Sequence, residues 1–358
     1  MFTANVFAQD KSAAKPADDE ILRVDTQLVD VPLVVTDKSG KALLNLKQSN
    51  FVVYEDGKRQ EVSDFAATNA PFEVALLLDT SGSARSDLDL IKRAAENFIA
   101  SLRAGDKVSI VAFTTRVQNN KMAAASEVLT GLTDDRNELK DALARVKTSN
   151  STPYYDALEI VAERVFNEKP ADEFRGRRAL VALTDGVDSS SISGFADARA
   201  EFERQGIVSY FIKVDTREFF EENLLGDCEA TMRFSQAQIR RYYRSFNAKS
   251  NVEKISDFCK IGDFERLAIS KNLYQLADAE MQNLAKTSGG RVFPVADLTE
   301  ARAAFQSVAR EIGTKYSLGY YSSNERRDGT RRKIRVELKG VPAGAQIRAR
   351  EGYTAPNN

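Results

Sequence analysis

The sequence predicts an α/β protein with a doubly wound, mostly parallel sheet, flanked by a small β-sandwich built from the N- and C-terminal segments. Apolar runs such as 72–78 and 178–184 suit strands that are buried on both faces, and they alternate with segments of helical periodicity. Strand-like segments separated by turn residues occupy both ends of the chain. The first observation predicts the sheet, and the second predicts the sandwich.

The N-terminal part is expected to contain a tether followed by a β segment. Residues 9–20 are rich in Lys, Ala, Asp and Pro and lack apolar periodicity, so that residues 1–20 are predicted to be a disordered tether or the remnant of a signal peptide. Residues 21–69 are expected to form the N-terminal β segment. Its strands are predicted in the alternation Val24, Thr26, Leu28 and in 29–36, 51–55 and 59–65, with turns at 37–41 and Asp56-Gly57.

The central α/β domain is expected to span residues 70–314. Its predicted strands are 72–78, 107–113, 178–184, 207–214 and 291–294, and its predicted helices are 86–102, 138–146, 155–166, 194–205, 274–287 and 298–312. Gly206 and Gly289-Gly290 are expected to end helices, and the second pair is not interpreted as a phosphate loop. Residues 216–272 are too long for an ordinary connection, so they are interpreted as an insertion with short helices of its own.

The C-terminal residues 315–355 are expected to return to β structure, with strands at 316–321, 331–338 and 345–349. Each terminal β segment alone would leave the edges of its strands exposed. We therefore predict that the two terminal segments pair into one sandwich, with the α/β domain inserted between them.

The composition disfavours several classes of function. The chain has 358 residues and a formal net charge of −1, which gives no electrostatic reason to expect nucleic acid or an anionic membrane as partner. The basic and aromatic run 240–244 is interpreted as a solvated helix face rather than a nucleic-acid site. No apolar run reaches the length of a transmembrane helix. The absence of histidine removes the usual catalytic triads and most zinc sites, so an enzyme is not expected.

The N-terminus and the cysteines bear on the compartment. Val6-Phe7-Ala8 before Gln9 resembles a signal-peptide cleavage region, although the preceding residues are too few and lack basic charge. An exported protein (periplasmic, cell-surface or secreted) with a truncated signal is expected, and an ordinary flexible N-terminus is the alternative. Cys228 and Cys259 are either a disulfide or two buried thiols, because spacing alone cannot establish the geometry.

Three oxygen-rich segments follow strands or begin helices in the α/β domain. Asp79, Ser81 and Ser83 come directly after the strand 72–78, Thr152 lies at the start of a helix, and Asp185 follows the strand 178–184. Ligands of open parallel sheets bind at the carboxyl ends of the strands, where these segments would meet. Oxygen ligands suit Mg²⁺ or Mn²⁺. The alternative for the first segment is a strand-to-helix turn whose serines cap the following helix.

At these positions the sequence strongly resembles the von Willebrand factor A domain family. Asp79-x-Ser81-x-Ser83, Thr152 and Asp185 match all five positions of that family's metal-ion-dependent adhesion site, and the resemblance covers about 72–314. The flanks, with Val29-Asp30-Val31-Pro32 and Arg350-Glu351-Gly352-Tyr353 among them, look like bacterial VWFA-related proteins of the acidobacterial type.

The resemblance implies a role for each residue. Ser81, Ser83 and Thr152 would offer hydroxyl oxygens directly to Mg²⁺ or Mn²⁺, while Asp79 and Asp185 would act through bound water and orient the hydroxyls. The implied function is non-enzymatic, metal-dependent binding of a protein partner that offers a carboxylate. The alternative is a structural or assembly protein of the cell envelope whose metal only stabilises the fold. The oligomeric state is left open.

Other polar residues near the five are given different roles. Asp156 is expected to cap or orient its helix rather than to bind the metal. Asp188 and Ser189 are interpreted as solvated loop residues, with the rim of the site as the alternative. The insertion 216–272 would lie beside the metal if it leaves the carboxyl end of its strand, and it could then supply specificity.

Overall fold

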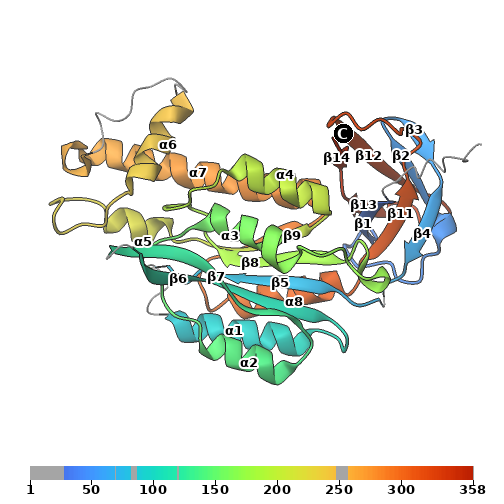
Figure 1. Cartoon of the computed structure of the whole chain (residues 1–358), viewed down its shortest axis with the longest axis horizontal. Helices are drawn as coiled ribbons and strands as arrows, with labels where there is room; N and C mark the ends of the chain where they lie inside the picture. The colour runs from blue at the N-terminus through green and yellow to red at the C-terminus, as the bar shows by residue number, and fades with distance from the viewer. Residues whose placement is uncertain (1–27, 69, 82–86, 119–120, 247–256, 358) are drawn as a thin grey trace, which may run out of the picture.

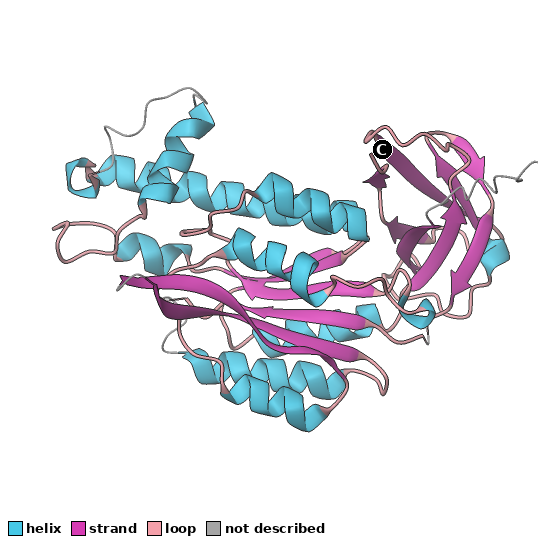
Figure 2. Ribbon diagram, viewed as in Figure 1, coloured by secondary structure: helices cyan, strands magenta, loops and turns pink. Residues whose placement is uncertain are grey.

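The computed structural model describes residues 28–68, 70–81, 87–118, 121–246 and 257–357. The predicted tether, the cleavage-like segment, the alternation before Leu28 and the predicted ligand Ser83 lie outside the described residues. Figure 2 shows the two parts of the described chain, an α/β body with helices on both faces of a sheet and an all-β part at one end.

The α/β body is built on a six-stranded sheet with the order β10-β9-β8-β5-β6-β7. The neighbours from β10 to β6 pair in parallel, and β7 pairs antiparallel to β6. The strands are β5 (Glu73–Leu78), β6 (Lys107–Gln118), β7 (Lys121–Thr133), β8 (Arg178–Thr184), β9 (Val208–Val214) and β10 (Arg291–Val295). The predicted doubly wound, mostly parallel sheet is therefore confirmed.

Two apolar layers sandwich this sheet, because alternate residues of each central strand face opposite sides (Figure 1). In β5, Leu76 belongs to the layer with α1, α2 and α8, and Leu77 belongs to the layer with α3, α4 and α7. The helices are α1 (Leu88–Ser101), α2 (Arg136–Ala144), α3 (Tyr154–Ile160), α4 (Phe195–Gln205), α7 (Asp263–Ser288) and α8 (Ala301–Ile312). A single π turn, Val161–Val165, extends α3, and a short 3-10 helix, Asp172–Phe174, precedes β8.

The structure corrects two expectations about the α/β domain. The strand β7 was not predicted, because its half-buried, small and polar residues form no continuous apolar run. The helix expected at 274–287 begins at Asp263 and is 26 residues long. Its first half packs against the core of the insertion through Ile269 and Leu273, and its second half packs against the sheet. Because the two halves pack against different cores, the apolar residues do not follow one regular helical period.

The all-β part contains two four-stranded sheets, with the orders β13-β1-β11-β4 and β14-β12-β2-β3. The N-terminal strands β1 and β2 pair antiparallel with the C-terminal strands β11 and β12. The strands are β1 (Leu28–Thr36), β2 (Phe51–Glu55), β3 (Lys58–Gln60), β4 (Val62–Ala66), β11 (Tyr316–Tyr321), β12 (Arg331–Leu338), β13 (Gln346–Ala349) and β14 (Gly352–Thr354), with a 3-10 turn at Gln48–Asn50. The two ends of the chain thus share one apolar core, as the fold prediction requires.

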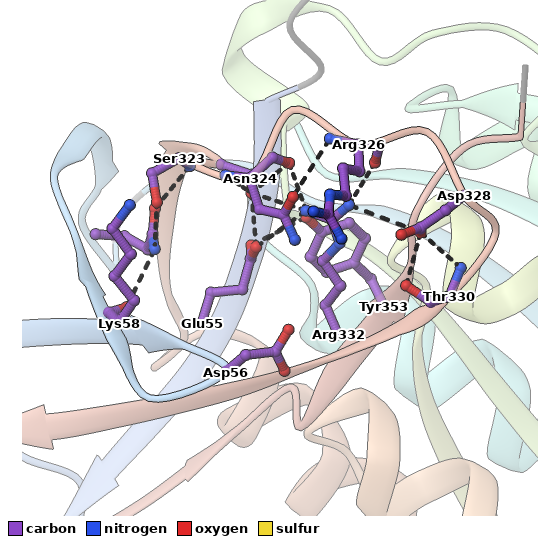
Figure 3. Close-up of polar contacts among 12 residues, drawn as sticks. Glu55, Asp56, Lys58, Ser323, Asn324, Arg326, Asp328, Thr330, Arg332 and Tyr353 are labelled. Carbon is purple, nitrogen blue, oxygen red and sulfur yellow. Dashed lines mark hydrogen bonds and ion pairs between the residues drawn. The ribbon is translucent and has the colours of Figure 1, made fainter.

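A buried ion pair fastens the N-terminal β2 to the C-terminal β12 (Figure 3). Arg332 Nη1 lies 3.3 Å from Glu55 Oε1, and each side chain is only 2% exposed. The hydroxyls of Tyr320 and Tyr353 donate to Glu55 Oε2 at 2.7 and 3.0 Å, and Ser322 Oγ donates to Oε1 at 2.6 Å. Since these donors come from three C-terminal segments, Glu55 holds both ends of the chain together.

The two linkers between the parts meet at Arg177, which is fully buried and directly precedes β8. Its guanidinium donates to the carbonyls of Ala70 and Pro71 before β5, and to the carbonyl of Lys315 before β11. One side chain therefore satisfies backbone acceptors of the incoming and the outgoing linker.

The insertion has a small core of its own at the end of the sheet opposite the all-β part (Figure 1). It contains α5 (Arg217–Glu222), α6 (Gln236–Phe246) and a 3-10 turn, Phe258–Lys260. Cys228 and Cys259 form a disulfide with a Cα–Cα distance of 5.3 Å, which decides between the two alternatives left by the sequence. Across the described residues, no helix combines the length and the apolar character that crossing a membrane requires.

Candidate metal centre

The carboxyl ends of β5 and β8 bring the first two oxygen-rich segments together. The strands pair in parallel, with Leu78 beside Leu183, and the backbone N–H of Asp79 continues the ladder to the Leu183 carbonyl at 2.9 Å. Asp79 Oδ2 accepts a hydrogen bond from Thr184 Oγ1 at 2.7 Å, and Oδ1 accepts one from the Ser81 N–H at 3.0 Å. Asp79 is therefore held at the end of β5 by Thr184 of β8 and by Ser81 of its own turn.

Thr152 reaches the same place from the loop before α3. The N–H of Ser149 donates to the Thr80 carbonyl at 2.7 Å, which ties this loop to the Asp79 turn. Thr152 itself exchanges two hydrogen bonds with Ser189, whose Oγ accepts from the Thr152 N–H at 2.8 Å and whose N–H donates to the Thr152 carbonyl at 3.0 Å. The loop after β8 therefore holds Thr152 in position.

Four of the five predicted residues are brought together by these contacts. Asp79, Ser81 and Thr152 are 6–8% exposed, and Ser81, Thr152 and Asp185 line one pocket of about 370 Å³. Asp79, Ser81 and Asp185 also line an adjoining pocket of about 250 Å³. Ser83, the fifth predicted residue, lies outside the described part of the chain.

Asp185 is held by residues that sequence reasoning did not single out. Its Oδ1 accepts from the Val187 N–H at 2.9 Å, and its Oδ2 accepts from Thr216 Oγ1 at 2.6 Å. Thr216 Oγ1 in turn lies 2.9 Å from the hydroxyl of Tyr274 on α7. Thr216 follows β9, so its position beyond a parallel strand could have indicated a place in the site. Tyr274 lies in the middle of α7, and nothing in its sequence position indicates such a role.

The electrostatics of the two carboxylates suit a cation. Burial raises the pKa of Asp79, and burial together with the negative charge of Asp79 raises the pKa of Asp185 to about 7. The hydrogen bonds to these carboxylates come from hydroxyls and backbone N–H groups. Among the described residues, no Lys or Arg donates to them. A divalent ion would relieve their repulsion, and a donor set made only of oxygens fits Mg²⁺ or Mn²⁺.

The loop after β8 also fastens the first turn of α3. Asp188 Oδ1 accepts from the Tyr154 N–H at 3.0 Å, and Ser191 Oγ accepts from the N–H groups of Tyr155 and Asp156 at 3.0 and 3.1 Å. Burial raises the pKa of Asp188 to about 6. The expectation that Asp188 is a solvated loop residue was therefore wrong, because its carboxylate satisfies a helix N-terminus from another loop. The carboxylate of Asp156 accepts from the backbone of the same loop.

Comparison with known proteins identifies the domain type. Residues 74–187 match the family model described as the von Willebrand factor type A domain. No curated protein matches the chain.

Solved structures with a similar arrangement share little sequence with this chain. Proximal thread matrix protein 1 from the mussel byssus is 14% identical over 84% of this chain, with a TM-score of 0.43, and the chain covers 51% of its length. Another structure of that protein is described as having a zinc-occupied MIDAS motif. It is 15% identical, with a TM-score of 0.44, and the match covers 72% of this chain and 49% of that protein. A von Willebrand factor type A protein from Catenulispora acidiphila is 12% identical, with a TM-score of 0.43 and coverage of 93% and 75%. We take no functional conclusion from these distant likenesses.

Proposed function

Because this chain contains a von Willebrand factor type A domain, a fold typical of protein-interaction modules, we propose that it is a non-enzymatic module that binds a protein partner through a divalent ion. The ion would be held at Asp79, Ser81, Ser83, Thr152 and Asp185. The observation that carries this proposal is the convergence of Ser81, Thr152 and Asp185, from three separate segments, on one pocket.

The hydrogen bonds of the two aspartates support the roles proposed for them. All four carboxylate oxygens of Asp79 and Asp185 accept an N–H or O–H group, which orients both side chains and suits them to act through bound water. The hydroxyls of Ser81, Ser83 and Thr152 would be the direct ligands. Bound Mg²⁺ or Mn²⁺ would supply a positive centre whose neutral direct ligands leave it attractive to a carboxylate of the partner.

Three further properties belong to the same proposal. The chain is taken to be divided at residues 21–69, 70–314 and 315–355, with the insertion at 216–272. Export to the periplasm, the cell surface or the medium agrees with the Cys228–Cys259 disulfide, since such bonds persist in oxidising compartments. A non-enzymatic role agrees with the absence of histidine from the sequence.

The direct test is calorimetric titration of Mg²⁺ and Mn²⁺ into the full chain. We expect the wild type to bind one ion and the Asp79→Ala variant to lose this binding with an unchanged circular dichroism spectrum. Asp141→Ala is the matched control, since Asp141 is an exposed aspartate on α2. Equal binding by the wild type and the Asp79→Ala variant would refute the assignment of the site.

A capture experiment tests the partner-binding role. Immobilised wild type and Asp79→Ala would be exposed to an envelope extract in Mg²⁺ and in EDTA, and retained proteins would be identified by mass spectrometry. We expect a protein retained only by the wild type and only with Mg²⁺. The same retained set under all four conditions, together with a lower melting temperature in EDTA, would instead favour an ion that only stabilises the fold.

A further inference from the structure

One pocket connects the proposed metal centre with the insertion. Its volume is about 370 Å³, and Ser81, Thr152 and Asp185 line it on the side of the metal centre. On the other side it is lined by Phe220, Met232, Arg233 and Phe234, which all belong to the insertion. We call this pocket, between those two sets of residues, the insertion groove. A ligand that reaches the metal centre from this side would contact the insertion.

The insertion side of the groove has an apolar wall that is held firmly. Phe220 contacts Phe234 and Tyr274 with ring-centroid distances of 5.5 and 6.4 Å, and Phe234 is buried against Phe258 at 6.0 Å. These rings come from α5, the loop before α6, the turn before α7 and α7 itself. Phe220, Phe234 and Tyr274 line the groove, and Phe258 packs behind Phe234. A wall supported in this way can receive an apolar side chain without first ordering itself.

The loop that carries Arg233 is fixed from two directions. The disulfide ties Cys228, in this loop, to Cys259. Buried Arg266 donates to the carbonyls of Leu224 and Gly226 at 3.2 and 3.0 Å, which holds the start of the loop on α7. Arg233 Nε donates to the Cys228 carbonyl at 2.7 Å, so the stem of this side chain is positioned by the loop itself.

The charge on Arg233 has no acidic counterpart in the described part of the chain. Its side chain is exposed, and the hydrogen bond to Cys228 is made to a neutral carbonyl. Among the described residues that line the insertion groove, the only other charged residue is Asp185, which belongs to the proposed metal centre. With a divalent ion bound, the groove would therefore have a positive centre at the ion, partly offset by Asp185, and a second positive charge at Arg233.

The pocket on the other side of Asp185 has the opposite character. It is lined by the carboxylates Asp79, Asp87, Asp185, Asp215 and Asp297, with neither Lys nor Arg among its described lining residues. A partner segment with several acidic residues would be repelled there and attracted by Arg233. The charges therefore select one of the two directions in which a partner can lie across the metal centre.

We propose that the insertion groove is a second recognition site, which takes an extended acidic segment of the partner protein. One carboxylate of this segment occupies the metal centre, an apolar or aromatic side chain packs on Phe220 and Phe234, and a second carboxylate pairs with Arg233. The inference rests on the proposed function and adds to it the chemistry of the partner. According to this proposal, the insertion determines which acidic partners bind.

The test is selection from a phage-displayed library of linear peptides that carry a fixed central aspartate and random flanking residues. The wild type, Arg233→Glu and Asp79→Ala are compared in Mg²⁺. Arg244→Glu is the matched control, because it reverses an exposed charge on α6 of the same insertion and does not line the groove. Arg233→Gln, whose folding is checked by circular dichroism, separates loss of the charge from its reversal.

We expect the wild type and Arg244→Glu to enrich peptides with a second acidic residue and an apolar residue on the same flank. Arg233→Glu should lose the second acidic residue from its consensus and bind the selected peptide at least about tenfold more weakly, with Arg233→Gln in between. Equal Kd values for the wild type and Arg233→Glu would refute the role of the groove in recognition and leave the proposed metal-dependent function standing. Absence of enrichment by the wild type, or the same peptides on Asp79→Ala, would overturn the proposed function and the groove with it.

Discussion

Replacing Arg332 by Met should destabilise the all-β part through the carboxylate that it leaves behind. Arg332 is the cation paired with Glu55, and both side chains are 2% exposed. The other donors to Glu55 that the structure places there are the neutral hydroxyls of Tyr320, Ser322 and Tyr353. The Met variant would therefore bury a carboxylate without its positive partner (Figure 3).

The magnitude follows from the same contacts. Breaking a buried pair from one side costs roughly 3–5 kcal/mol. The carbonyls of Asn324 and Arg326, which also accept from Arg332, belong to exposed residues, so water can replace those two hydrogen bonds at little cost. The buried Nε of Arg332 finds no partner among the described residues, so the wild-type pair is not fully satisfied. We therefore expect about 3 kcal/mol, the lower end of that range.

Urea denaturation of the wild type, Arg332→Met, Glu55→Gln and the double variant measures this effect. The double variant should be more stable than Arg332→Met alone, because the neutral glutamine side chain that replaces Glu55 needs no cation and keeps an acceptor for the tyrosine hydroxyls. The reasoning would be refuted if Arg332→Met lost less than about 1 kcal/mol, or if the losses of the two single variants simply added. Mg²⁺ binding by the folded fraction should not change, since this network lies in the other part of the molecule.

Three further outcomes are expected. Changing both Cys228 and Cys259 to Ser should cost about 3.7 kcal/mol by the chain-entropy relation for a sequence separation of 31, measured by limited proteolysis and urea denaturation of the insertion. Burial lowers the pKa of Lys315 to about 7, below its unfolded value near 10.5, so the unfolded chain binds the extra proton between these values. Stability should therefore rise with pH across that window by up to about 1.4 kcal/mol per pH unit, and Lys315→Met should flatten the slope in urea titrations. Thr216→Val removes the hydroxyl that donates to Asp185 Oδ2 and should weaken Mg²⁺ binding about 10- to 100-fold by calorimetry, whereas an unchanged Kd would remove Thr216 from the site.

Patterns that lie within one short segment were read correctly from the sequence. The apolar run 178–184 coincides with β8, and Gly206 ends α4 in the left-handed conformation that favours glycine, with φ +68°. The resemblance of the α/β domain to the von Willebrand factor A family also rests on such local motifs, and the match at 74–187 confirms it. Periodicity and turn chemistry are local properties, so one sequence suffices to see them.

Features shared between two segments were read less well. The strand β7 has little apolar signal of its own, because it gains its order from the edge of β6. The start of α7 at Asp263 was missed because the early turns of this helix face the core of the insertion rather than the sheet. In both cases the partner that stabilises the element is distant in sequence.

The sequence by itself determined most of the strands and helices along the chain, with β7 as the main omission, and four oxygen-bearing residues that the structure gathers at one end of the sheet. Only the tertiary structure decided that Thr216 and Tyr274 hold Asp185 and that Asp188 secures the helix next to Thr152. It also decided that Arg233 of the insertion lines the same pocket as Asp185. The physical reason is that side-chain hydrogen bonds and pocket walls join residues far apart in the chain. Their partners are fixed by the packing of whole elements, which no single segment encodes.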